Sequence, residues 1–490
     1  MKTLSLNEYS ALLPESTALF CDLYEFTMCN GYYELGMKDT IAYFDLFFRK
    51  VPDGGGFAIM AGLSQLIDYL RRFKFSADDI SFLRDTGKFS EGFLDYLKNL
   101  RFTCDVWAVP EGTPVFPGEP LVTVRGPIIE AQLIETMSLT FINHQTLIAT
   151  KANRIVRAAA GRRVLEFGAR RAHGLSAALF GARAAYIGGC DCSSLTAAEH
   201  IVGVPSAGTM AHSWVQSFDD ELTAFRAYAK LYPDSCVLLV DTYDTLGSGL
   251  PNAITTFKEL AERGYRPGGI RIDSGDITYL SKRARKMLDA AGFPECDILA
   301  SNSLDEVIVQ DMLMQGADVD CFGIGERLIT ASSDPILGCV YKLVAMENTE
   351  GDIIPKIKLS DNVSKITLPF FKQAWRLFDY DTGKAIADVV AMHHETIDDS
   401  KPYELFDPEY IWKRKTVERF IARRLTTRIF EDGQCVYTSP DTGEIRRYCR
   451  GQVSTLWDEV TRMQNPHGYY VDLSQELYDS RESLIKQARK

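Results

Sequence analysis

The stretch from residue 237 to residue 276 reads VLLVDTYDTLGSGLPNAITTFKELAERGYRPGGIRIDSGD. It begins with a short apolar run, continues with a helical pattern and ends with a second short apolar run. Two aspartates follow each run closely: Asp241 and Asp244, then Asp273 and Asp276. The stretch therefore predicts a strand, a helix and a second strand, with acidic groups at the carboxyl end of each strand.

The same rhythm fills the middle of the chain. Apolar runs recur every ~20–30 residues, a spacing typical of strand–helix units that build a parallel sheet. The runs lie at residues 164–167, 185–188, 204–206, 237–240, 269–272, 298–300 and 319–322. Seven such units, or eight with residues 339–344, predict an α/β fold with a closed or nearly closed, irregular β/α barrel. An open, doubly wound sheet is the alternative.

Changes in the pattern of apolar and polar residues along the chain predict three domains. Residues 1–130 read as an N-terminal α+β domain, with an aromatic-rich strand at 41–51. Residues 131–345 hold the barrel, which a long helical pattern at 137–160 introduces. Residues 346–490 return to short, hairpin-like pieces and end in a charged helical segment.

The composition excludes several classes of protein. The chain has 54 basic and 66 acidic residues, a formal charge of −12, which argues against non-specific nucleic-acid binding but permits a locally basic site. No stretch approaches the ~20 apolar residues that cross a bilayer, and the first 20 residues lack the layout of a signal peptide. Eleven cysteines in apolar surroundings predict reduced thiols and a cytoplasmic protein.

In β/α barrels the active site lies at the carboxyl ends of the strands. The residues that follow the seven apolar runs are unusually polar or rich in glycine. They include Arg170, Arg171, Asp191, His212, Asp241, Asp273, Asp276, Ser303, Gly323 and Gly325. One such cluster would be ordinary, because acids and glycines also cap helices and make turns. Seven in succession predict a functional site at one rim.

The inventory of this rim suits a substrate with phosphates, a metal ion and a flat partner. Arginine pairs with phosphate or carboxylate. Carboxylates hold Mg²⁺, usually through water, and hydrogen-bond ribose hydroxyls. Glycine-rich loops at helix N-termini bind phosphate through backbone N–H groups. Taken alone, Asp191 is more often a helix cap and Gly323-x-Gly325 is as often a tight turn, so the prediction depends on the whole set.

At these residues the sequence resembles the nicotinate phosphoribosyltransferase family, which are type II phosphoribosyltransferases. The matching blocks are D-L-Y-E-F-T-M at 22–28, F-D-L-F-F-R-K-V-P at 44–52, E-F-G-x-R-R at 166–171, G-G-x-D at 188–191, G-T-x-A-H-S at 208–213 and R-x-D-S-G-D at 271–276. The match covers nearly the whole chain, and the combination is specific where any single block is not. Cys190, where a bulkier apolar residue is common, is a mild departure.

The resemblance implies a β/α barrel together with a smaller α+β domain, built from the N-terminal segment and part of the C-terminal chain. The C-terminal segment would pack on the N-terminal domain and the barrel. The resemblance also implies a homodimer with shared active sites, in which Tyr24 comes from the partner subunit. Tyr24 and Phe167 would sandwich the pyridine ring, and such stacking contributes ~0.5–1.5 kcal/mol beyond area burial.

The resemblance assigns further roles to the rim. The arginines that would bind the carboxylate and the phosphates are Arg170, Arg171 and Arg271. The acids that would bind the substrates are Asp191, Asp241, Asp273 and Asp276, the last two also holding Mg²⁺ through water. The residues that would hold the 5′-phosphate are Ser303, Gly323 and Gly325.

His212 receives the sharpest assignment. In the resembling family this histidine is phosphorylated by ATP, and ATP hydrolysis then drives the synthesis. A neutral imidazole nitrogen is a competent nucleophile toward a γ-phosphate. Mg²⁺ and arginines would neutralise the transferring phosphoryl group. The alternative is that His212 only hydrogen-bonds a phosphate.

The expected enzyme converts nicotinate and 5-phosphoribosyl 1-pyrophosphate to nicotinate mononucleotide and pyrophosphate, in NAD salvage. With ATP hydrolysis coupled to synthesis, it would be a ligase-like glycosyltransferase whose catalytic residues include His212, Asp273 and Asp276. One alternative is nicotinamide phosphoribosyltransferase, which carries Gly where this chain has Arg171. Quinolinate phosphoribosyltransferase is shorter and would need more cations. A catalytically silent barrel that binds nucleotides is the remaining alternative, although every motif residue is present.

Overall fold

The computed structural model describes residues 17–360 and 366–488 of the 490-residue chain. The chain forms two compact units. Unit 1 contains residues 151–335, and unit 2 contains the chain before and after it, up to residue 150 and from residue 336. The passage between them lies within one long helix, α6 (Glu135–Ala158), where a helix was predicted. The domain limits expected near residues 130 and 345 stay predictions.

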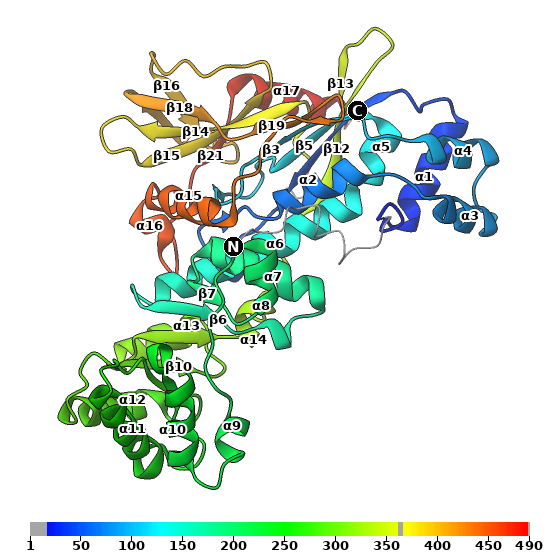
Figure 1. Cartoon of the computed structure of the whole chain (residues 1–490). Coiled ribbons are helices and arrows are strands. Elements are labelled where there is room, and N and C mark those ends of the chain that lie inside the picture. Colours follow the sequence, from blue (N-terminus) through cyan, green and yellow to red (C-terminus); the bar gives the residue numbers. More distant parts are fainter. Residues whose placement is uncertain (1–16, 361–365, 489–490) are drawn as a thin grey trace. The chain divides into compact units, whose positions relative to one another are not determined.

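Unit 1 is built on a six-stranded parallel sheet with the order β7-β6-β11-β10-β9-β8 (Figure 1). The strands are β6 (Arg163–Glu166), β7 (Cys192–Ser193), β8 (Val237–Leu239), β9 (Gly269–Ile272), β10 (Asp297–Ser301) and β11 (Cys321–Ile324). Leu238, Ile270 and Ile298 in their middles are fully buried. Strands covered on both faces need such apolar runs. The α/β class with a parallel sheet is therefore confirmed.

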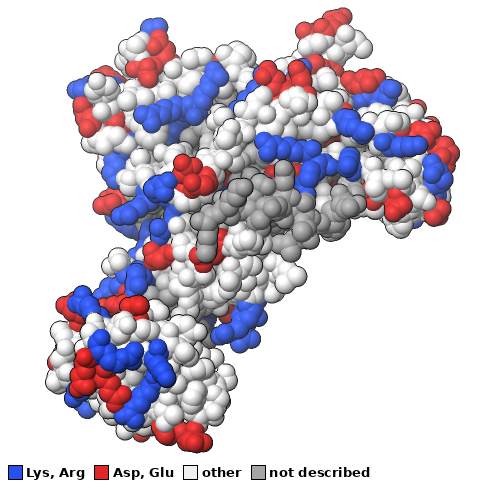
Figure 2. Space-filling model, in the orientation of Figure 1, with Lys and Arg blue, Asp and Glu red and all other residues white. Residues whose placement is uncertain are grey.

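Helices follow the strands around this sheet. They are α7 (Leu175–Gly188), α8 (Thr196–Val202), α9 (His212–Gln216), α10 (Glu221–Leu231), α11 (Leu250–Glu262), α12 (Ile277–Ala290), α13 (Glu306–Met314) and α14 (Glu326–Ile329). Over α10–α12 basic and acidic side chains are interspersed on the surface (Figure 2). One such pair joins Arg226 Nη2 to Glu259 Oε1 at 2.5 Å.

Three predicted strands are wrong in type or partner. Residues 185–188 are the last turn of α7, whose alanine-rich sequence forms a helix until Gly189 ends it with a φ of 121°. Residues 204–206 contribute only a single parallel bridge, from Ser206 to Ser193. The expected eighth unit at 339–344 is β12 (Val340–Glu347), which lies in unit 2 and pairs antiparallel with β1 (Ile41–Phe47).

Unit 2 carries a seven-stranded sheet of the order β13-β12-β1-β5-β3-β19-β20. Its further strands are β3 (Asp105–Ala108), β5 (Val122–Pro127), β13 (Ile353–Pro355), β19 (Thr427–Glu431) and β20 (Gln434–Cys435). N-terminal and C-terminal segments thus share one sheet, as the resemblance implied. By these bounds unit 2 contains more residues than unit 1 and is not the smaller part, because the C-terminal segment joins it in full.

A second sheet of unit 2 has the order β18-β14-β15-β21. Its strands are β14 (Lys372–Asp379), β15 (Ala385–Met392), β18 (Phe420–Arg424) and β21 (Val471–Leu473). Two further sheets have two strands each and pair β2 (Ala58–Ile59) with β4 (Pro114–Val115) and β16 (Tyr403–Phe406) with β17 (Arg414–Val417). The helices are α1 (Leu23–Glu34), α2 (Leu63–Arg72), α3 (Ala77–Asp85), α4 (Glu91–Asn99), α5 (Ile128–Leu133), α15 (Thr442–Ser454), α16 (Asp458–Thr461) and α17 (Gln475–Ala488).

Unit 2 contains buried ion pairs, and one of them joins its N-terminal and C-terminal segments. Asp45 in β1 accepts a hydrogen bond from Thr123 Oγ1 at 2.7 Å and forms an ion pair with Lys372, and both charged side chains are almost completely buried. Arg376 in β14 makes a bidentate contact with Asp388 at 2.6 and 2.7 Å. Buried charges are tolerated when they are paired in this way, and removing one partner is costly.

Two further expectations bear on where the protein works. All eleven cysteines are free, and eight of them are buried. None of the helices in the described ranges is long and apolar enough to cross a membrane. Residues 1–16, to which the expectation about a signal peptide mainly refers, lie outside the described residues.

Candidate active site

The parallel sheet of unit 1 brings the predicted rim residues together. In register, Arg271 of β9 pairs with Leu299 of β10, Ser301 of β10 with Gly323 of β11, and Ile324 of β11 with Glu166 of β6. Because all these strands run in one direction, their carboxyl ends meet at a single edge. The segments that begin at Phe167, Asp273, Asn302 and Gly325 therefore start side by side.

Arg271 is the centre of a hydrogen-bond network at this edge. Its Nε donates to Ser301 Oγ at 2.8 Å, its Nη1 to Thr209 Oγ1 at 3.0 Å and its Nη2 to Asp273 Oδ1 at 2.9 Å. Its Cζ lies 5.6 Å from the centroid of the Phe167 ring. The side chain is only 11% exposed. The guanidinium is thus fixed before any ligand binds, and it ties the loop at Thr209 to two strand ends.

Asp241 and Asp273 form an adjacent pair of carboxylates. Asp241 Oδ2 accepts from the Asp273 backbone N–H at 3.0 Å and from Ser274 Oγ at 2.6 Å. Asp241 Oδ1 is buried and has no hydrogen-bond partner among the described residues. A buried carboxylate oxygen left unpaired is costly and marks a place where a ligand or cation completes the set. No group of three His, Cys, Asp or Glu side chains in the described chain is arranged to hold a metal.

His212 begins helix α9 and faces these carboxylates. Its Nδ1 lies 3.2 Å from Thr242 Oγ1, and its Nε2 lies 3.8 Å from Asp273 Oδ2. The side chain is 39% exposed. Thr242 thus holds one ring nitrogen, while the other is directed to the carboxylate side of the site and stays accessible. A nucleophilic Nε2 requires the tautomer in which Nδ1 carries the proton and donates to Thr242 Oγ1.

Phe167 and the glycines of β11 are packed to fit each other. The Phe167 backbone N–H donates to Ile324 O at 2.8 Å. A Cβ on Gly323 would stand 2.6 Å from Phe167 Cε2, and one on Gly325 would stand 2.9 Å from the Phe167 carbonyl oxygen. No real Cβ atom fits at 2.6 Å. The glycines therefore seat the Phe167 ring in addition to any role in phosphate binding.

The loop after β10 holds an unusual backbone. Asn302 and Ser303 have φ values of 101° and 42°, in the left-handed region that few residues other than glycine adopt. Such residues cost about 1–3 kcal/mol each and cluster at functional sites. Ser303 is exposed at the end of the strand beside Gly323. The structure thus brings Ser303, Gly323 and Gly325 to neighbouring loops.

The arginine pair after β6 is less constrained. Arg170 and Arg171 lie in a short 3-10 helix, η3 (Ala169–Arg171), and both are exposed. Arg171 Nε is 3.8 Å from Glu326 Oε2, and both side chains are about 60% exposed, 62% and 60%. Arg170 makes no ion pair within the described part of the chain. Both cations can therefore reorient toward an anionic ligand.

Two predicted acids have structural partners. Asp276 caps helix α12, with its Oδ1 accepting from the Tyr279 N–H at 2.9 Å. Asp191 precedes β7, and its Oδ2 accepts from the Val164 N–H at 3.0 Å. Because residues 185–188 are helical, Asp191 does not follow a strand as predicted. It lies beside the beginning of β6 instead of its carboxyl end.

Several side chains that hold the site together were not among the predicted site residues. Glu166 is fully buried and accepts from Ser193 Oγ at 2.5 Å and from the Gly168 N–H, and burial raises its pKa. Thr209, Thr242 and Ser301 bind Arg271 or His212. The sequence could have indicated these three hydroxyl residues, because each follows an apolar run or stands in one of the matching motifs. Glu166 likewise stands in the E-F-G-x-R-R motif.

Tyr24, the remaining predicted residue, lies in helix α1 of unit 2. Its side chain is 46% exposed, although it is a large aromatic residue. Phe20, Leu23 and Met28 beside it are 51%, 55% and 38% exposed. Tyr24 and Met28 are four residues apart and share one face of α1, Leu23 directly precedes Tyr24, and Phe20 lies just before the helix. Unit 2 thus presents an exposed apolar patch that includes Tyr24.

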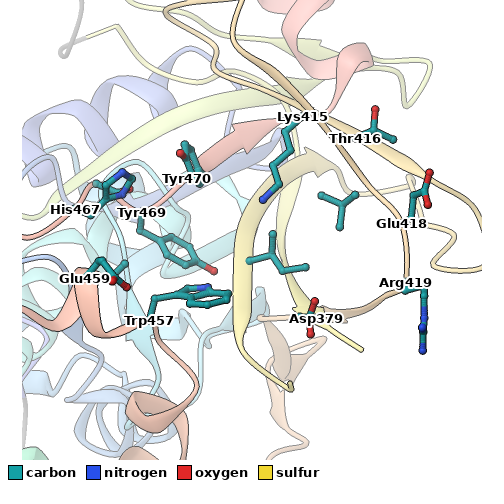
Figure 3. Close-up of a pocket in the computed structure, with 14 residues that line it drawn as sticks. Asp379, Lys415, Thr416, Glu418, Arg419, Trp457, Glu459, His467, Tyr469 and Tyr470 are labelled. Carbon is teal, nitrogen blue, oxygen red and sulfur yellow. The ribbon is translucent and has the colours of Figure 1, made fainter. Parts of the chain in front are cut away.

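A cavity of about 560 Å³ lies within unit 2 (Figure 3). Trp457, His467, Tyr469 and Tyr470 line it, and Lys415 reaches into it from β17. None of the predicted site residues is among its walls. The Trp457 indole N–H donates to the Ala385 carbonyl at 2.7 Å, which gives this ring a structural role.

Comparison with known proteins identifies relatives over nearly the whole chain. Three family profiles match: the nicotinate phosphoribosyltransferase (NAPRTase) N-terminal domain at residues 19–143, the NAPRTase family at 162–382 and the nicotinate phosphoribosyltransferase C-terminal domain at 371–481. A nicotinate phosphoribosyltransferase of Bacillus subtilis is 43% identical over 475 residues, which are 97% of this chain and 96% of the relative.

Solved structures agree with this relationship. The crystal structure of human nicotinic acid phosphoribosyltransferase superposes with a TM-score of 0.83 at 32% identity, covering 94% of this chain and 99% of the human chain. A nicotinate-nucleotide pyrophosphorylase from Pyrococcus furiosus superposes with a TM-score of 0.69 at 22% identity, over 93% of this chain and 99% of that chain. At that identity the second likeness concerns the fold alone.

Proposed function

The chain belongs to the nicotinate phosphoribosyltransferase family, and from that premise we propose that it makes nicotinate mononucleotide for NAD biosynthesis. The substrates are nicotinate and phosphoribosyl pyrophosphate. The pyridine nitrogen attacks C1 of the ribose, the bond from C1 to the pyrophosphate oxygen breaks, and pyrophosphate leaves. The enzyme contributes mainly by positioning the two substrates and by stabilising charge.

The Arg271 network carries this proposal. A guanidinium held by Thr209, Asp273 and Ser301, close to the face of the Phe167 ring, is prepared for an anion attached to a flat ring. Arginine pairs bidentately with carboxylate or phosphate. Phe167 supplies one wall for the pyridine ring, and the exposed Arg170 and Arg171 supply further positive charge. Ser303, Gly323 and Gly325 would hold the 5′-phosphate at the neighbouring loops.

The carboxylates fit a magnesium ion bound together with the diphosphate. Mg²⁺ neutralises phosphate charge and usually keeps several waters on one or two carboxylates. We assign Asp273 and Asp276 as these carboxylates, as the sequence predicted, and add Asp241, whose buried Oδ1 lacks a partner among the described residues. Asp241 and Asp273 would also accept hydrogen bonds from the ribose hydroxyls. Asp191 accepts a hydrogen bond from the backbone near the beginning of β6 and is the least supported of the predicted substrate ligands.

His212 is the proposed acceptor of a phosphoryl group from ATP. Its Nε2 would attack the γ-phosphate, the bond to the bridging oxygen would break, and ADP would leave. Support comes from Thr242, which holds Nδ1, and from the accessible Nε2 beside Asp273. Incubation with γ-labelled ATP and Mg²⁺ should give an acid-labile label that His212→Asn abolishes, while slow ATP-independent synthesis survives. Undiminished labelling of the variant would place the nucleophile elsewhere.

The active site is proposed to be shared between two copies of the chain. The exposed apolar patch of Phe20, Leu23, Tyr24 and Met28 at the start of α1 supports this, since exposed apolar patches often mark interaction surfaces. Tyr24 would then stack on the pyridine ring in the partner's site. Light scattering should report a dimer, and inactive Tyr24→Ala and His212→Ala chains should recover part of the activity in heterodimers. Heterodimers without activity would contradict a shared site.

A cytoplasmic location is proposed from the eleven free cysteines, since reducing compartments keep thiols in this state. The function itself is tested by measuring pyrophosphate release with nicotinate, nicotinamide and quinolinate in parallel. Only nicotinate should support fast turnover, because charge-assisted hydrogen bonds to its carboxylate contribute about 1.5–3 kcal/mol. Equal activity with nicotinamide would contradict the proposed specificity and favour a nicotinamide phosphoribosyltransferase.

A further inference from the structure

An ion pair joins the two loops of unit 1 that would hold the 5′-phosphate. Asp305 ends the loop after β10, and Arg327 lies in the first turn of α14, directly after the loop that follows β11. Arg327 Nη1 contacts Asp305 Oδ2, and the two side chains are 38% and 17% exposed. Asp305 stands two residues after Ser303, and Arg327 stands two residues after Gly325. The pair therefore bridges the loops close to a predicted phosphate ligand on each side.

Asp305 uses its two carboxylate oxygens for different helices. Its Oδ1 accepts a hydrogen bond from the Ile308 N–H at 2.9 Å and so caps α13. Its Oδ2 meets Arg327 of α14. Burial acts to raise the pKa of Asp305, but the Ile308 N–H and the Arg327 guanidinium outweigh it and lower this pKa, so the carboxylate stays charged. One acid thus ties the beginning of α13 to α14.

The backbone around Arg327 is fixed by packing. Leu328 and Ile329, the next two residues, are buried, and the Ile329 N–H donates to the Gly325 carbonyl at 3.0 Å. The short helix α14 is therefore held against the core of unit 1, while the Arg327 side chain extends to Asp305. The arginine can restrain the loop after β10 because its own backbone has little freedom.

A neighbouring buried contact has a different task. Glu306, the residue after Asp305, is 3% exposed and accepts from Lys151 Nζ at 2.8 Å and from Arg154 Nε at 3.1 Å. Both cations belong to α6. Removing one partner from such a buried set is costly for the whole fold. The Glu306 contact thus anchors α13 in the interior, whereas the partly exposed pair of Asp305 and Arg327 stands at the proposed phosphate loops.

The loop between these anchors needs restraint. Asn302 and Ser303 have φ values of 101° and 42°. Residues in this region persist only when the surrounding structure fixes them. If α13 and α14 were not joined, the loop could relax to ordinary backbone angles, and Ser303 would leave its place near Gly323. A phosphate site that is formed before its ligand binds avoids the cost of ordering the loop.

We propose that Asp305 and Arg327 are positioning residues for the 5′-phosphate of phosphoribosyl pyrophosphate: their ion pair keeps the loops after β10 and β11 at the spacing that one phosphate group requires. The inference rests on the proposed function, in which Ser303, Gly323 and Gly325 hold that phosphate. The pair acts through the loops and touches no substrate. Its loss should therefore weaken binding at the 5′-phosphate end and leave the nicotinate and pyrophosphate sites unchanged.

The test is a double-mutant cycle on the full-length enzyme. Asp305→Asn keeps an oxygen for the helix cap, where Asn and Asp are equally favoured, but turns an amide NH₂ group toward Arg327. Arg327→Met keeps an unbranched side chain and removes the guanidinium. Each variant should raise the KM for phosphoribosyl pyrophosphate by about three- to tenfold, the loss expected for one partly exposed charged contact. The double variant should raise this KM no further, and the KM for nicotinate should not change.

Product inhibition separates the two ends of the substrate. Nicotinate mononucleotide carries the 5′-phosphate and pyrophosphate does not. In both variants inhibition by nicotinate mononucleotide should weaken by the same factor as the KM for phosphoribosyl pyrophosphate rises, whereas inhibition by pyrophosphate should stay as in the wild type. Asp220→Asn is the matched control, because Asp220 caps α10 by accepting from the Thr223 N–H at 2.8 Å and belongs to neither phosphate loop. It should change neither inhibition.

Three results would overturn the proposal. Additive effects of the two substitutions would show that the residues do not act as a pair. An effect of Arg327→Met far larger than that of Asp305→Asn would mean that Arg327 contacts the phosphate itself, and equal weakening of both product inhibitions would mean a general structural loss. An unchanged KM for phosphoribosyl pyrophosphate in Arg327→Met also decides against it, and this variant keeps the cap of α13 and can be judged even if Asp305→Asn does not fold.

The wild-type measurement separates this inference from the proposed function. If wild-type enzyme releases no pyrophosphate with nicotinate, the proposed function fails before any variant is made. If wild-type enzyme is active with nicotinate and the cycle shows no coupling, only the role of Asp305 and Arg327 fails.

Discussion

Two groups of arginines at the edge of the unit 1 sheet are held in opposite ways. Arg271 is 11% exposed and makes three hydrogen bonds to neighbouring side chains. Arg171 is 62% exposed, and its nearest carboxylate, on Glu326, is 3.8 Å away. The same residue type at the same edge thus occurs in a buried, hydrogen-bonded form and in an exposed form.

The difference teaches what each group can contribute. A preorganised donor costs no reorganisation when charge develops, and such donors stabilise transition states. An exposed, rotatable arginine adapts to a ligand and contributes mainly to binding. Arg271 should therefore affect kcat, and Arg170 and Arg171 should affect KM. The fixed group extends to the seat of Phe167 against Gly323, because that contact also leaves no room for adjustment.

The largest effect is expected at Arg271. Arg271→Ala should lower kcat/KM by about 10²–10³-fold, the usual loss when one preorganised donor is removed. Arg271→Lys should recover little, because a single ammonium group cannot satisfy Thr209, Asp273 and Ser301 with the planar geometry of a guanidinium. Steady-state kinetics measure both. Arg226→Ala, at an exposed ion pair between α10 and α11, is the control and should leave activity unchanged. A lysine variant within twofold of wild type would show that Arg271 acts as a simple point charge.

A smaller effect is expected where the fixed group meets the ring. Gly323→Ala would place a Cβ 2.6 Å from Phe167 Cε2 and force the ring to move. Overpacking of this kind costs about 1–3 kcal/mol, and the KM for nicotinate should rise by about tenfold to a hundredfold. Gly451→Ala, where a Cβ would meet no atom within 4 Å, is the matched control. Thermal unfolding and the KM for nicotinate are the measurements, and an unaltered KM would mean that the Phe167 ring is not the stacking wall.

The exposed arginines, Arg170 and Arg171, should give a still smaller effect, and it should appear in KM and not in kcat. Arg171→Ala should raise the KM for nicotinate about tenfold, as expected for one lost charge-assisted hydrogen bond, and leave kcat within about twofold. Turnover with nicotinamide should not fall, because nicotinamide lacks the carboxylate. Arg170→Ala serves as the neighbouring comparison. A loss in kcat equal to that of Arg271→Ala would remove the distinction between the two groups.

The sequence predicted the sheet that carries Arg271 only in part. The apolar runs at 237–240, 269–272, 298–300 and 319–322 became strands, because short runs buried on both faces have few other structures to form. The run at 185–188 did not, since a short apolar segment fits a buried helix equally well. Its misassignment also displaced Asp191 from the expected place at the rim.

Other features depend on contacts between residues that are far apart in sequence. The pairing of β12 with β1 joins residues about 300 positions apart, which no local pattern reports. The partners of Arg271 likewise come from three different segments, namely the loop at Thr209 and the ends of β9 and β10, so its fixed state could not be read from the R-x-D-S-G-D block. The exposure of Arg170 and Arg171 was equally hidden. The residue types at the rim were predictable, whereas their contacts and exposure were not.

The smallest expected effect tests whether the ion pair between the exposed Arg171 and Glu326 influences nicotinate binding. Glu326 faces Arg171 at 3.8 Å, and exposed pairs of this kind contribute about 0–1 kcal/mol. Glu326→Gln removes the competing carboxylate, so Arg171 becomes slightly more available to the substrate. The KM for nicotinate should therefore fall by up to about threefold at low salt. At high ionic strength the pair is already screened in the wild type, so the two enzymes should converge. Glu259→Gln, which breaks an exposed ion pair with Arg226, should show no such convergence because its KM never departs from wild type. A rise in KM for Glu326→Gln would mean that Glu326 orients Arg171 toward the substrate, and the second arginine group would then be as preorganised as the first.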